Sequence, residues 1–333
     1  MRVIFGALKE FNDDAMMMAK QFGADGIHFN TPPIPGDKTW NRVGLRWLKD
    51  YCTRFGLRLE AIENVPIRFY DKVLLGQDGR DEQIENYINI IRCMGEEQIP
   101  VLGHHFCPNW AWRTTLAAKG RGGANVSAYH QADEKTTGNA YVYPYITDGK
   151  FPTHDELWAN YFYFMEAVLP VAEQCGVKLA IHPSDPPLPF VDGKARIFTS
   201  PEDFDKADAH LQSSAWAINL CLGCFSQYGG EKAVLSLIKK WGERKKIVSV
   251  HFRDVCGGGT DFQECFLGEG NFDPARVLEA LYDVDYDGFI IDDHVPYTVN
   301  HTRWGHTARA HETGYIQGML KMLIYQKNKQ ATK

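Results

Sequence analysis

The chain has 333 residues, with 36 basic and 42 acidic side chains and a formal net charge of −6. This mild acidity offers no basic surface for nucleic acid or an anionic membrane, and no stretch approaches the roughly 18 consecutive apolar residues of a membrane helix. Eight cysteines are too dilute for a disulfide scaffold, so we expect a protein of the reducing cytoplasm. The remaining class is an ordinary globular protein with a sizeable core.

Short apolar or alternating segments recur along the chain, and an amphipathic segment follows each of them. The pattern predicts strands at 3–7, 26–30, 57–63, 101–106, 178–182, 217–223, 247–253 and 288–293. It predicts helices at 12–22, 40–55, 81–94, 154–175, 201–211, 231–241, 274–282 and 308–323. Eight strand–helix units in strict alternation favour an α/β fold, a single (β/α)8 TIM barrel over residues 1–333. A doubly wound sheet is disfavoured because no Gly-x-Gly-x-x-Gly turn follows the first strand.

Two connections are unusually long, at about 107–152 and 255–272. Both follow the carboxyl ends of predicted strands, which is the face where barrel active sites are built. The first contains the Gly/Ala-rich segment AAKGRGGANVSA at 117–128, which we interpret as a mobile loop. We therefore expect long active-site loops at these two places.

Four consecutive strands end in side chains that bind metals. His182 follows the fifth strand, Cys221 ends the sixth, His251 lies on the seventh and Asp293 ends the eighth. Each residue alone is readily explained as a packing or capping residue. Neighbouring strands lie about 4.8 Å apart, so the four side chains can converge on one divalent ion, for which imidazole, thiolate and carboxylate are all suitable ligands.

Several segments resemble the D-mannonate dehydratase family. The segment 177–204, with its HPSDPP motif, is similar to the fifth-strand region of that family, whose motif is HPDDPP. LCLG at 220–223, VHFRD at 250–254 and DDHV at 292–295 resemble the family's Cys, His-x-Arg and Asp-His stretches. EAIENVPI at 60–67 and FCPNWAWRT at 106–114 resemble its third- and fourth-strand ends.

This resemblance implies a xylose-isomerase-like barrel and a metal-dependent lyase. The family removes water from D-mannonate to give 2-keto-3-deoxy-D-gluconate in hexuronate breakdown. By matching motifs, the metal ligands are His182, Cys221, His251 and Asp293, and His294 is the catalytic imidazole. The expected ion is Mn²⁺, with Fe²⁺ as the second choice.

Other residues have supporting roles in this interpretation. Arg253, two residues beyond His251, is expected to hold the substrate carboxylate bidentately or to form a salt bridge at the barrel rim. Glu63 is expected to orient a ligand or to form an ion pair, and His105 and Trp112 are expected to line the sugar pocket. Asp185 is expected to rigidify its turn through bonds to the backbone.

The sequence also departs from the family pattern. Ile291-Asp292 replaces an Arg-Pro pair, Val295 replaces a glycine, and a family tyrosine falls on Thr307. Tyr297, His306 and His311 are candidate replacements for that tyrosine. Two alternatives stay open: a metal-dependent sugar isomerase or epimerase, and a sugar-acid-binding homologue without catalysis. We also expect a homo-oligomer, with an exposed aromatic surface from Trp40 to Trp47 as a candidate interface.

Overall fold

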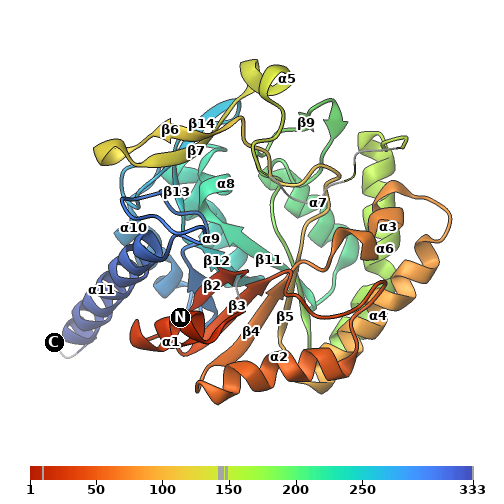
Figure 1. Ribbon diagram of the computed structural model, residues 1–333, viewed down its shortest axis with the longest axis horizontal. Helices are drawn as coiled ribbons and strands as arrows, with labels where there is room; N and C mark the ends of the chain where they lie inside the picture. Colours follow the sequence, from red (N-terminus) through yellow and green to blue (C-terminus); the bar gives the residue numbers. More distant parts are fainter. Residues whose placement is uncertain (10, 142–145, 147–148, 332–333) are drawn as a thin grey trace.

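Parallel strands form the central barrel of the structure, a computed structural model that describes residues 1–9, 11–141, 146 and 149–331 (Figure 1). The strand order is β1-β15-β12-β11-β8-β5-β4-β3-β2. Only Ile4 separates β1 (Arg2–Val3) from β2 (Phe5–Leu8), and these two pair with β15 and β3, so one N-terminal segment closes the barrel. The other strands are β3 (Gly26–Asn30), β4 (Arg58–Glu63), β5 (Val101–His104), β8 (Lys178–Ile181), β11 (Trp216–Cys221), β12 (Ile247–His251) and β15 (Phe289–Ile291). The predicted xylose-isomerase-like (β/α)8 barrel is confirmed.

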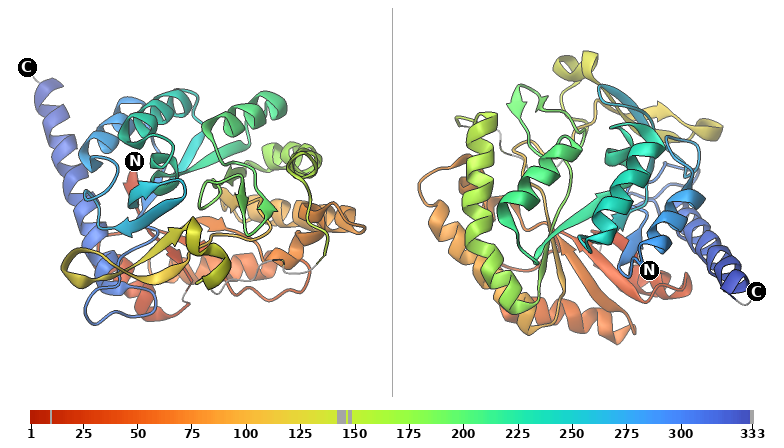
Figure 2. Two further views of the ribbon diagram at one scale, coloured as in Figure 1. Left: turned by 90° about the horizontal axis from the view of Figure 1, so that it is seen from above. Right: turned by 180° about the vertical axis from the view of Figure 1, so that it is seen from behind.

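A helix follows each strand and covers the outside of the barrel, as both views in Figure 2 show. The main helices are α1 (Asp13–Gln21), α2 (Arg42–Arg54), α4 (Arg80–Glu96), α6 (His154–Cys175), α7 (Pro201–Leu211), α9 (Gly230–Glu243), α10 (Pro274–Asp283) and α11 (His306–Ala331). Local sequence explains where several begin. Thr153 forms a capping box with Glu156 at the start of α6, and Asp273 caps α10 with Pro274 at its first position.

Two apolar layers hold the barrel together. The larger lies between the sheet and the helices and includes the buried side chains of Trp216 and Trp241. The smaller fills the inside of the barrel with mostly compact residues, namely Ile4, Ala7, Ala61, Val101, Ala180, Phe289 and Ile291. Small side chains suit this interior because eight strands leave room only for a packed core.

The two long connections contain a second sheet instead of irregular loops. The hairpins β6 (Thr115–Lys119)–β7 (Asn125–His130) and β13 (Asp254–Gly258)–β14 (Asp261–Cys265) join in the antiparallel order β13-β14-β7-β6. They lie together at the top of Figure 1. The expected mobile loop at 117–128 is therefore wrong. Gly122 and Gly123 supply the positive φ angles of a tight turn, and Tyr129 packs against Phe262 across the hairpins.

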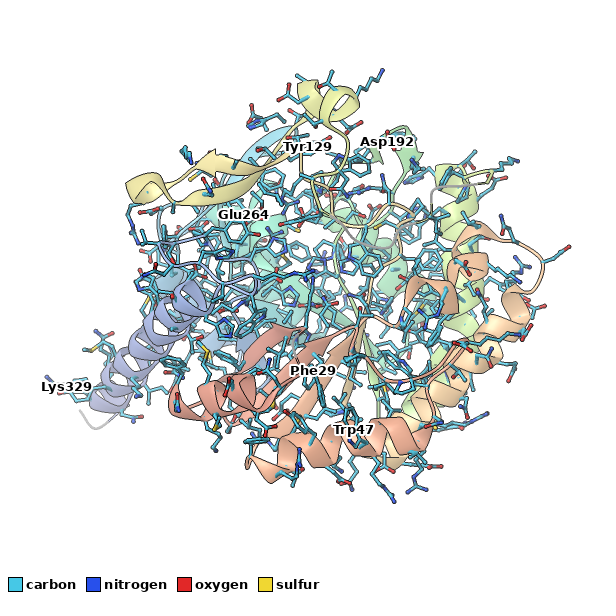
Figure 3. All side chains as sticks on the ribbon, in the orientation of Figure 1. Phe29, Trp47, Tyr129, Asp192, Glu264 and Lys329 are labelled. Atoms are coloured by element: carbon cyan, nitrogen blue, oxygen red, sulfur yellow. The ribbon has the colours of Figure 1, made fainter. Side chains whose placement is uncertain are left out.

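The expected exposed aromatic surface from Trp40 to Trp47 is confirmed for only one of the two tryptophans. Trp40 is completely buried, whereas Trp47 is 48% exposed and lies at the periphery of the molecule in Figure 3. Trp47 stacks on Phe11, with ring centroids 4.6 Å apart. In the described part of the chain, no helix is long and apolar enough to cross a membrane.

Arg309 ties α11 to the barrel at Asp292, where the sequence departs from the family that it resembles. Its guanidinium donates to the Asp292 carboxylate and to the carbonyl oxygens of Gly6 at 2.8 Å, Asp293 at 2.7 Å and Trp304 at 2.8 Å. The Asp292 carboxylate is buried, so Arg309 supplies the charge that this unusual acidic residue requires.

We expect Arg309→Met to lower the free energy of unfolding by about 3–5 kcal/mol, because it leaves the Asp292 carboxylate buried without its cation. Urea denaturation followed by circular dichroism measures the change. The double variant Asp292→Asn/Arg309→Met removes both charges and is expected to recover part of the loss. Equal destabilisation in the single and double variants would show that the ion pair is not the cause.

Candidate active site

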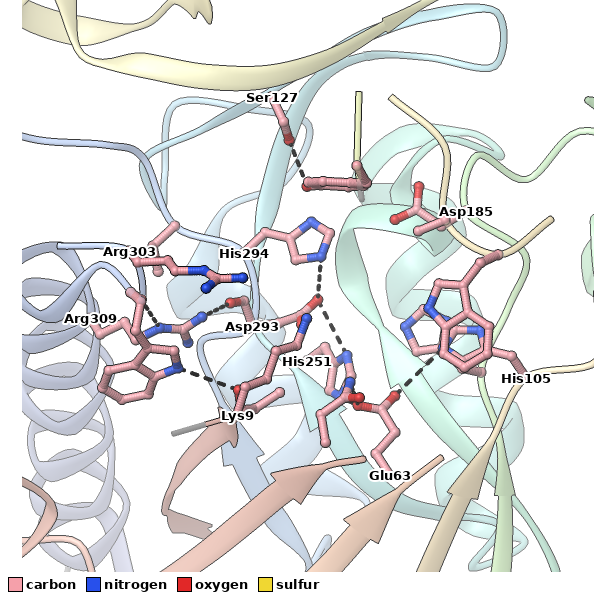
Figure 4. Close-up of a pocket in the computed structure, with 18 of the residues that line it drawn as sticks. Lys9, Glu63, His105, Ser127, Asp185, His251, Asp293, His294, Arg303 and Arg309 are labelled. Atoms are coloured by element: carbon pink, nitrogen blue, oxygen red, sulfur yellow. Dashed lines mark hydrogen bonds and ion pairs between the residues drawn. The ribbon is translucent and has the colours of Figure 1, made fainter. Parts of the chain in front are cut away.

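A cavity of about 160 Å³ opens at the carboxyl ends of the strands (Figure 4). Its wall combines histidines, acids, cations and aromatic rings from nearly all parts of the chain. The lining residues are Ala7, Lys9, Asn30, Glu63, His105, Trp110, Ala111, Ser127, Tyr141, His182, Asp185, His251, Asp293, His294, Val295, Tyr297, Arg303, Trp304 and Arg309. A cavity with several convergent polar groups is the usual form of a small-molecule site.

The four expected metal ligands meet at the floor of this cavity. One ligand atom from each of them, His182, Cys221, His251 and Asp293, lies within 4.8 Å of the others, and all four residues are buried. Strand register causes this convergence, because Cys221 on β11 lies directly beside His251 on β12. Asp293 follows β15 with a φ of +62°, a left-handed conformation that aspartate tolerates, and its Oδ2 lies 3.3 Å from His251 Nδ1.

The donor set fits a divalent cation. Although burial alone would raise the pKa of Cys221, the Cys224 thiol and the Arg253 guanidinium hold it well below the usual range of a thiol. Burial likewise opposes ionisation of Asp293, yet nearby histidines lower its pKa. Burial disfavours the cationic form of His251, but Asp293 and Glu63 raise its pKa well above the usual value. The cluster thus supplies anionic ligands and favours positive charge, as a cation site does.

Local contacts orient two of the imidazoles. His182 Nδ1 lies 2.7 Å from the carbonyl oxygen of Pro183, which assigns the proton to Nδ1 and leaves Nε2 free for an ion. His251 Nε2 lies 2.9 Å from the side-chain amide of Asn219. Within the described chain, Nδ1 of His251 and Oδ1 of Asn219 lack a hydrogen-bond partner.

A buried network of charges adjoins the cluster. Arg113 donates to both oxygens of Asp185 at 2.8 Å and to Glu264 at 2.7 Å. Arg253 donates to the same two carboxylates, at 2.8 Å to Asp185. Glu264 belongs to β14 and lies below the β6–β7 hairpin in Figure 3. Asp185 therefore forms buried ion pairs, where the sequence predicted only bonds to its own backbone.

The Arg253 guanidinium also contacts sulfur. Nε lies 3.2 Å from Cys221 Sγ, and a terminal nitrogen lies 3.2 Å from Cys224 Sγ. The fully buried side chain also pairs with the carboxylates of Asp185, Glu264 and Asp293, the last with Nε 3.3 Å from Oδ2. The structure thus places Arg253 within the protein beside the metal ligands.

His294 reaches the cavity next to the ligand Asp293. Its Nδ1 lies 3.0 Å from Glu264 Oε1, and its Nε2 lies 3.9 Å from Asp293 Oδ2. Although burial would raise it, the pKa of Glu264 is lowered by Arg253 and His294, so the carboxylate is ionised. An ionised carboxylate is an acceptor only, so His294 donates Nδ1–H to Glu264, and Nε2 is the ring nitrogen that faces Asp293.

Glu63 and His105 both line the cavity. The Glu63 carboxylate is buried and accepts from the amides of Asn30 at 3.1 Å and Asn219 at 3.3 Å. It also lies 3.8 Å from His105 Nε2 and 3.7 Å from His28 Nε2. Burial lowers the pKa of His28 to about 4, so this imidazole is neutral, and sequence reasoning missed it because a single inward histidine carries no pattern.

Trp110, and not the expected Trp112, lines the pocket. Trp112 packs with Tyr129, Val191, Val255 and Phe262 beneath the hairpins, whereas Trp110 lines the cavity. Trp110 has a φ of +55°, and this local backbone turn could not be read from the sequence. Lys9 and Arg303 also line the cavity and were missed, because both lie in connections without a regular pattern.

The position of the family tyrosine is distant from the chemistry. Thr307 lies exposed in the first turn of α11, and His306 instead contacts Thr302 Oγ at 2.6 Å. Of the three candidate replacements, Tyr297 lines the cavity. Tyr141 also lines it, 5.9 Å from the His294 ring, and its hydroxyl lies 3.0 Å from Ser127 Oγ. Sequence reasoning missed Tyr141 because it lies in the long fourth connection.

Comparisons with known proteins agree with this architecture. A family model described as D-mannonate dehydratase matches residues 9–152 and 150–331. A mannonate dehydratase of Streptococcus pneumoniae (strain 70585) is 30% identical over 297 residues, which cover 82% of this chain and 79% of the relative.

Solved structures agree as well. The crystal structure of mannonate dehydratase from Streptococcus suis serotype 2 matches with a TM-score of 0.84 and 27% identity, covering 98% of this chain and 96% of that chain. A xylose isomerase-like TIM barrel protein from Mycobacterium smegmatis matches with a TM-score of 0.58 at 11% identity, covering 92% and 87% of the two chains, and is similar in fold alone. The chain therefore belongs to the D-mannonate dehydratase family, and it is an enzyme of the hydro-lyase class.

Proposed function

We propose that this protein removes water from D-mannonate to form 2-keto-3-deoxy-D-gluconate, with a bound divalent metal, in the cytoplasmic breakdown of hexuronates. The observation that carries the proposal is the convergence of His182, Cys221, His251 and Asp293 at the floor of a cavity. Membership of the dehydratase family supports the reaction class. The modest cavity volume suits a small sugar acid.

The same four residues would hold the metal, with Mn²⁺ as the first candidate and Fe²⁺ as the second. Two nitrogens, a sulfur and an oxygen accommodate several divalent ions, so cellular supply decides among them. When bound, the ion supplies Lewis-acid stabilisation for the negative charge that develops on the substrate carboxylate and C2 oxygen.

Dehydration requires removal of the C2 proton and protonation of the departing C3 hydroxyl. We assign the first step to His294, because its Nδ1–H is held by Glu264 and its Nε2 lone pair is available for the proton. The Glu264 carboxylate then stabilises the imidazolium that forms. We assign the second step to the Tyr141 hydroxyl, which lies near the His294 ring and is oriented by Ser127.

The remaining residues bind and orient. Lys9 and Arg303 are cations in the cavity wall and are suited to the anionic substrate. Glu63, His105 and Trp110 are suited to its hydroxyls and apolar face. We assign Arg253 to positioning: its bonds hold the Cys221 sulfur and the Glu264 carboxylate in place, and the guanidinium is too deeply buried to bind the substrate carboxylate.

A metal-dependent isomerase or epimerase is the less favoured alternative, because such enzymes usually rely on carboxylate-rich ligand sets and this cluster has a thiol and only one carboxylate. The other alternative is a sugar-acid-binding homologue without catalysis. The buried Asp292–Arg309 pair explains one departure from the family as a structural contact. The three interpretations differ in their product: a dehydratase releases a keto-deoxy acid, an isomerase or epimerase releases an isomer of its substrate, and a binding homologue releases no product.

The purified protein, assayed without oxygen with D-mannonate and added Mn²⁺, is expected to release 2-keto-3-deoxy-D-gluconate and to hold one metal ion per chain. The His182→Ala/Cys221→Ala variant is expected to lose both metal and product, because two of four ligands are gone. Metal analysis and product chromatography measure the two quantities. Metal without product would overturn D-mannonate as substrate, and absence of metal after supplementation would overturn the site.

His294→Asn is expected to lower kcat by about 10²–10⁴-fold with bound metal unchanged, because it removes the proton acceptor and spares the ligands. The matched control is His130→Asn, which changes an exposed histidine paired with Asp261 on the hairpins and should leave kcat unchanged. Steady-state kinetics and metal analysis separate these results. A His294→Asn enzyme with wild-type kcat would exclude this residue as the base.

Tyr141→Phe is expected to lower kcat by about 100-fold or more, because it deletes the hydroxyl that protonates the leaving group and retains the ring. Thr307→Ala, at the exposed position of the family tyrosine, is the control and should behave as wild type. The same kinetic assay applies. If Thr307→Ala loses activity and Tyr141→Phe does not, the assignment of the acid is wrong.

A further inference from the structure

A second cysteine lies against the proposed ligand Cys221 and has no part in the chemistry described above. Cys221 is the N-cap of α8 (Leu222–Ser226), and Cys224 lies within that helix, so the pair has the spacing Cys-x-x-Cys. Both thiols are completely buried, and both lie against the Arg253 guanidinium. All eight cysteines of the chain are unpaired.

One guanidinium bridges the two sulfurs. Arg253 Nε and a terminal nitrogen of the same side chain each lie 3.2 Å from one sulfur. Adjacent nitrogens of a guanidinium are held in a rigid planar fork, so both sulfurs face the same edge of it. Residues three apart in helical geometry have Cα atoms about 5 Å apart, which is within the range that a disulfide requires.

We propose that Cys221 and Cys224 form a reversible oxidation site that takes a hydroperoxide as its oxidant and removes Cys221 from the metal cluster. The loss of metal in this proposal rests on the proposed function, whereas formation of the disulfide does not. His182, His251 and Asp293 line the cavity, and the Cys221 sulfur lies within 4.8 Å of their ligand atoms. In protein stripped of metal, a molecule as small as hydrogen peroxide would reach this sulfur by passing between the three side chains that line the cavity.

The chemistry balances with hydrogen peroxide as the oxidant. Cys221 gives up its thiol proton and its sulfur, held by Arg253, attacks one peroxide oxygen; an S–O bond forms, the O–O bond breaks, and the departing hydroxide takes up that proton and leaves as water. The Cys224 thiol then attacks the Cys221 sulfur, an S–S bond forms, the S–O bond breaks and water leaves with the thiol proton. Two thiols are oxidised to a disulfide and one peroxide is reduced to two waters. A dithiol reductant reverses the change.

Oxidation and metal binding are mutually exclusive in this proposal. A thiolate that coordinates an ion is a weaker nucleophile than a free one, so a loaded site is protected. Once the disulfide has formed, only His182, His251 and Asp293 remain as ligands, and the site loses its sulfur donor.

The test treats the full-length, fully reduced protein with hydrogen peroxide, once stripped of metal by a chelator and once loaded with Mn²⁺. Intact mass, thiol titration in denaturant and peptide mapping follow the disulfide, and metal analysis follows the ion. We expect the stripped protein to lose two thiols as a Cys221–Cys224 disulfide and to lose Mn²⁺ binding until a dithiol restores it. The loaded protein is expected to retain its thiols under the same treatment.

Two variants provide the controls. Cys224→Ser is expected to bind Mn²⁺ as the wild type does. In this variant peroxide is expected to oxidise Cys221 to a sulfenic or sulfinic acid, and no disulfide forms. Cys224→Ala is the second choice if the serine destabilises the fold. Cys256→Ser removes one member of another neighbouring pair, Cys256 and Cys265, in the β13–β14 hairpin. It should leave the Cys221–Cys224 disulfide unchanged.

Two results would overturn the proposal: oxidation of the stripped wild-type protein without a Cys221–Cys224 disulfide, or a disulfide form that still binds Mn²⁺ as the reduced form does. Neither readout requires turnover of D-mannonate. A failure of the substrate assignment therefore stays distinguishable from a failure of the oxidation site.

Discussion

The active site depends on the buried guanidinium of Arg253. It contacts the sulfur of the ligand Cys221, the carboxylate of Asp185 and the carboxylate of Glu264, and these belong to β11, to the turn after β8 and to the hairpin strand β14. A buried charge is tolerated only when neighbours compensate it. Arg253 therefore couples the metal ligands to the group that holds His294, and all these elements must be in place together.

The second sheet extends this coupling to the entrance of the barrel. The hairpins bring Glu264 from β14 and Ser127 from β7 to this region: Glu264 contacts His294 Nδ1, and Ser127 contacts the neighbouring Tyr141. Arg113, from the start of the fourth connection, adds a second cation between Asp185 and Glu264. The two long connections thus supply the residues that surround His294, while the barrel strands supply the four expected metal ligands.

Sequence patterns predicted the barrel and the convergence of four side chains at one end of it, for a clear reason. A parallel strand and its helix each have a local hydrophobic period, and the carboxyl ends of parallel strands share one face of the barrel. The structure accordingly brings His182, Cys221, His251 and Asp293 together. The errors concern features that no hydrophobic periodicity marks. The segment 117–128 forms a hairpin whose pairing partner lies more than a hundred residues away, and Trp110, not Trp112, lines the cavity.

The amino-acid sequence by itself determined the eight strand–helix units, the face that carries the site and four candidate ligands for a metal ion, because these follow from local periodicity and from positions at strand ends. Only the tertiary structure decided what surrounds them. Arg253 lies beside the expected ligands instead of in the cavity, and Glu264 and Tyr141 meet His294. Each of these contacts depends on the balance of buried charge and on packing between distant segments, which no local pattern encodes.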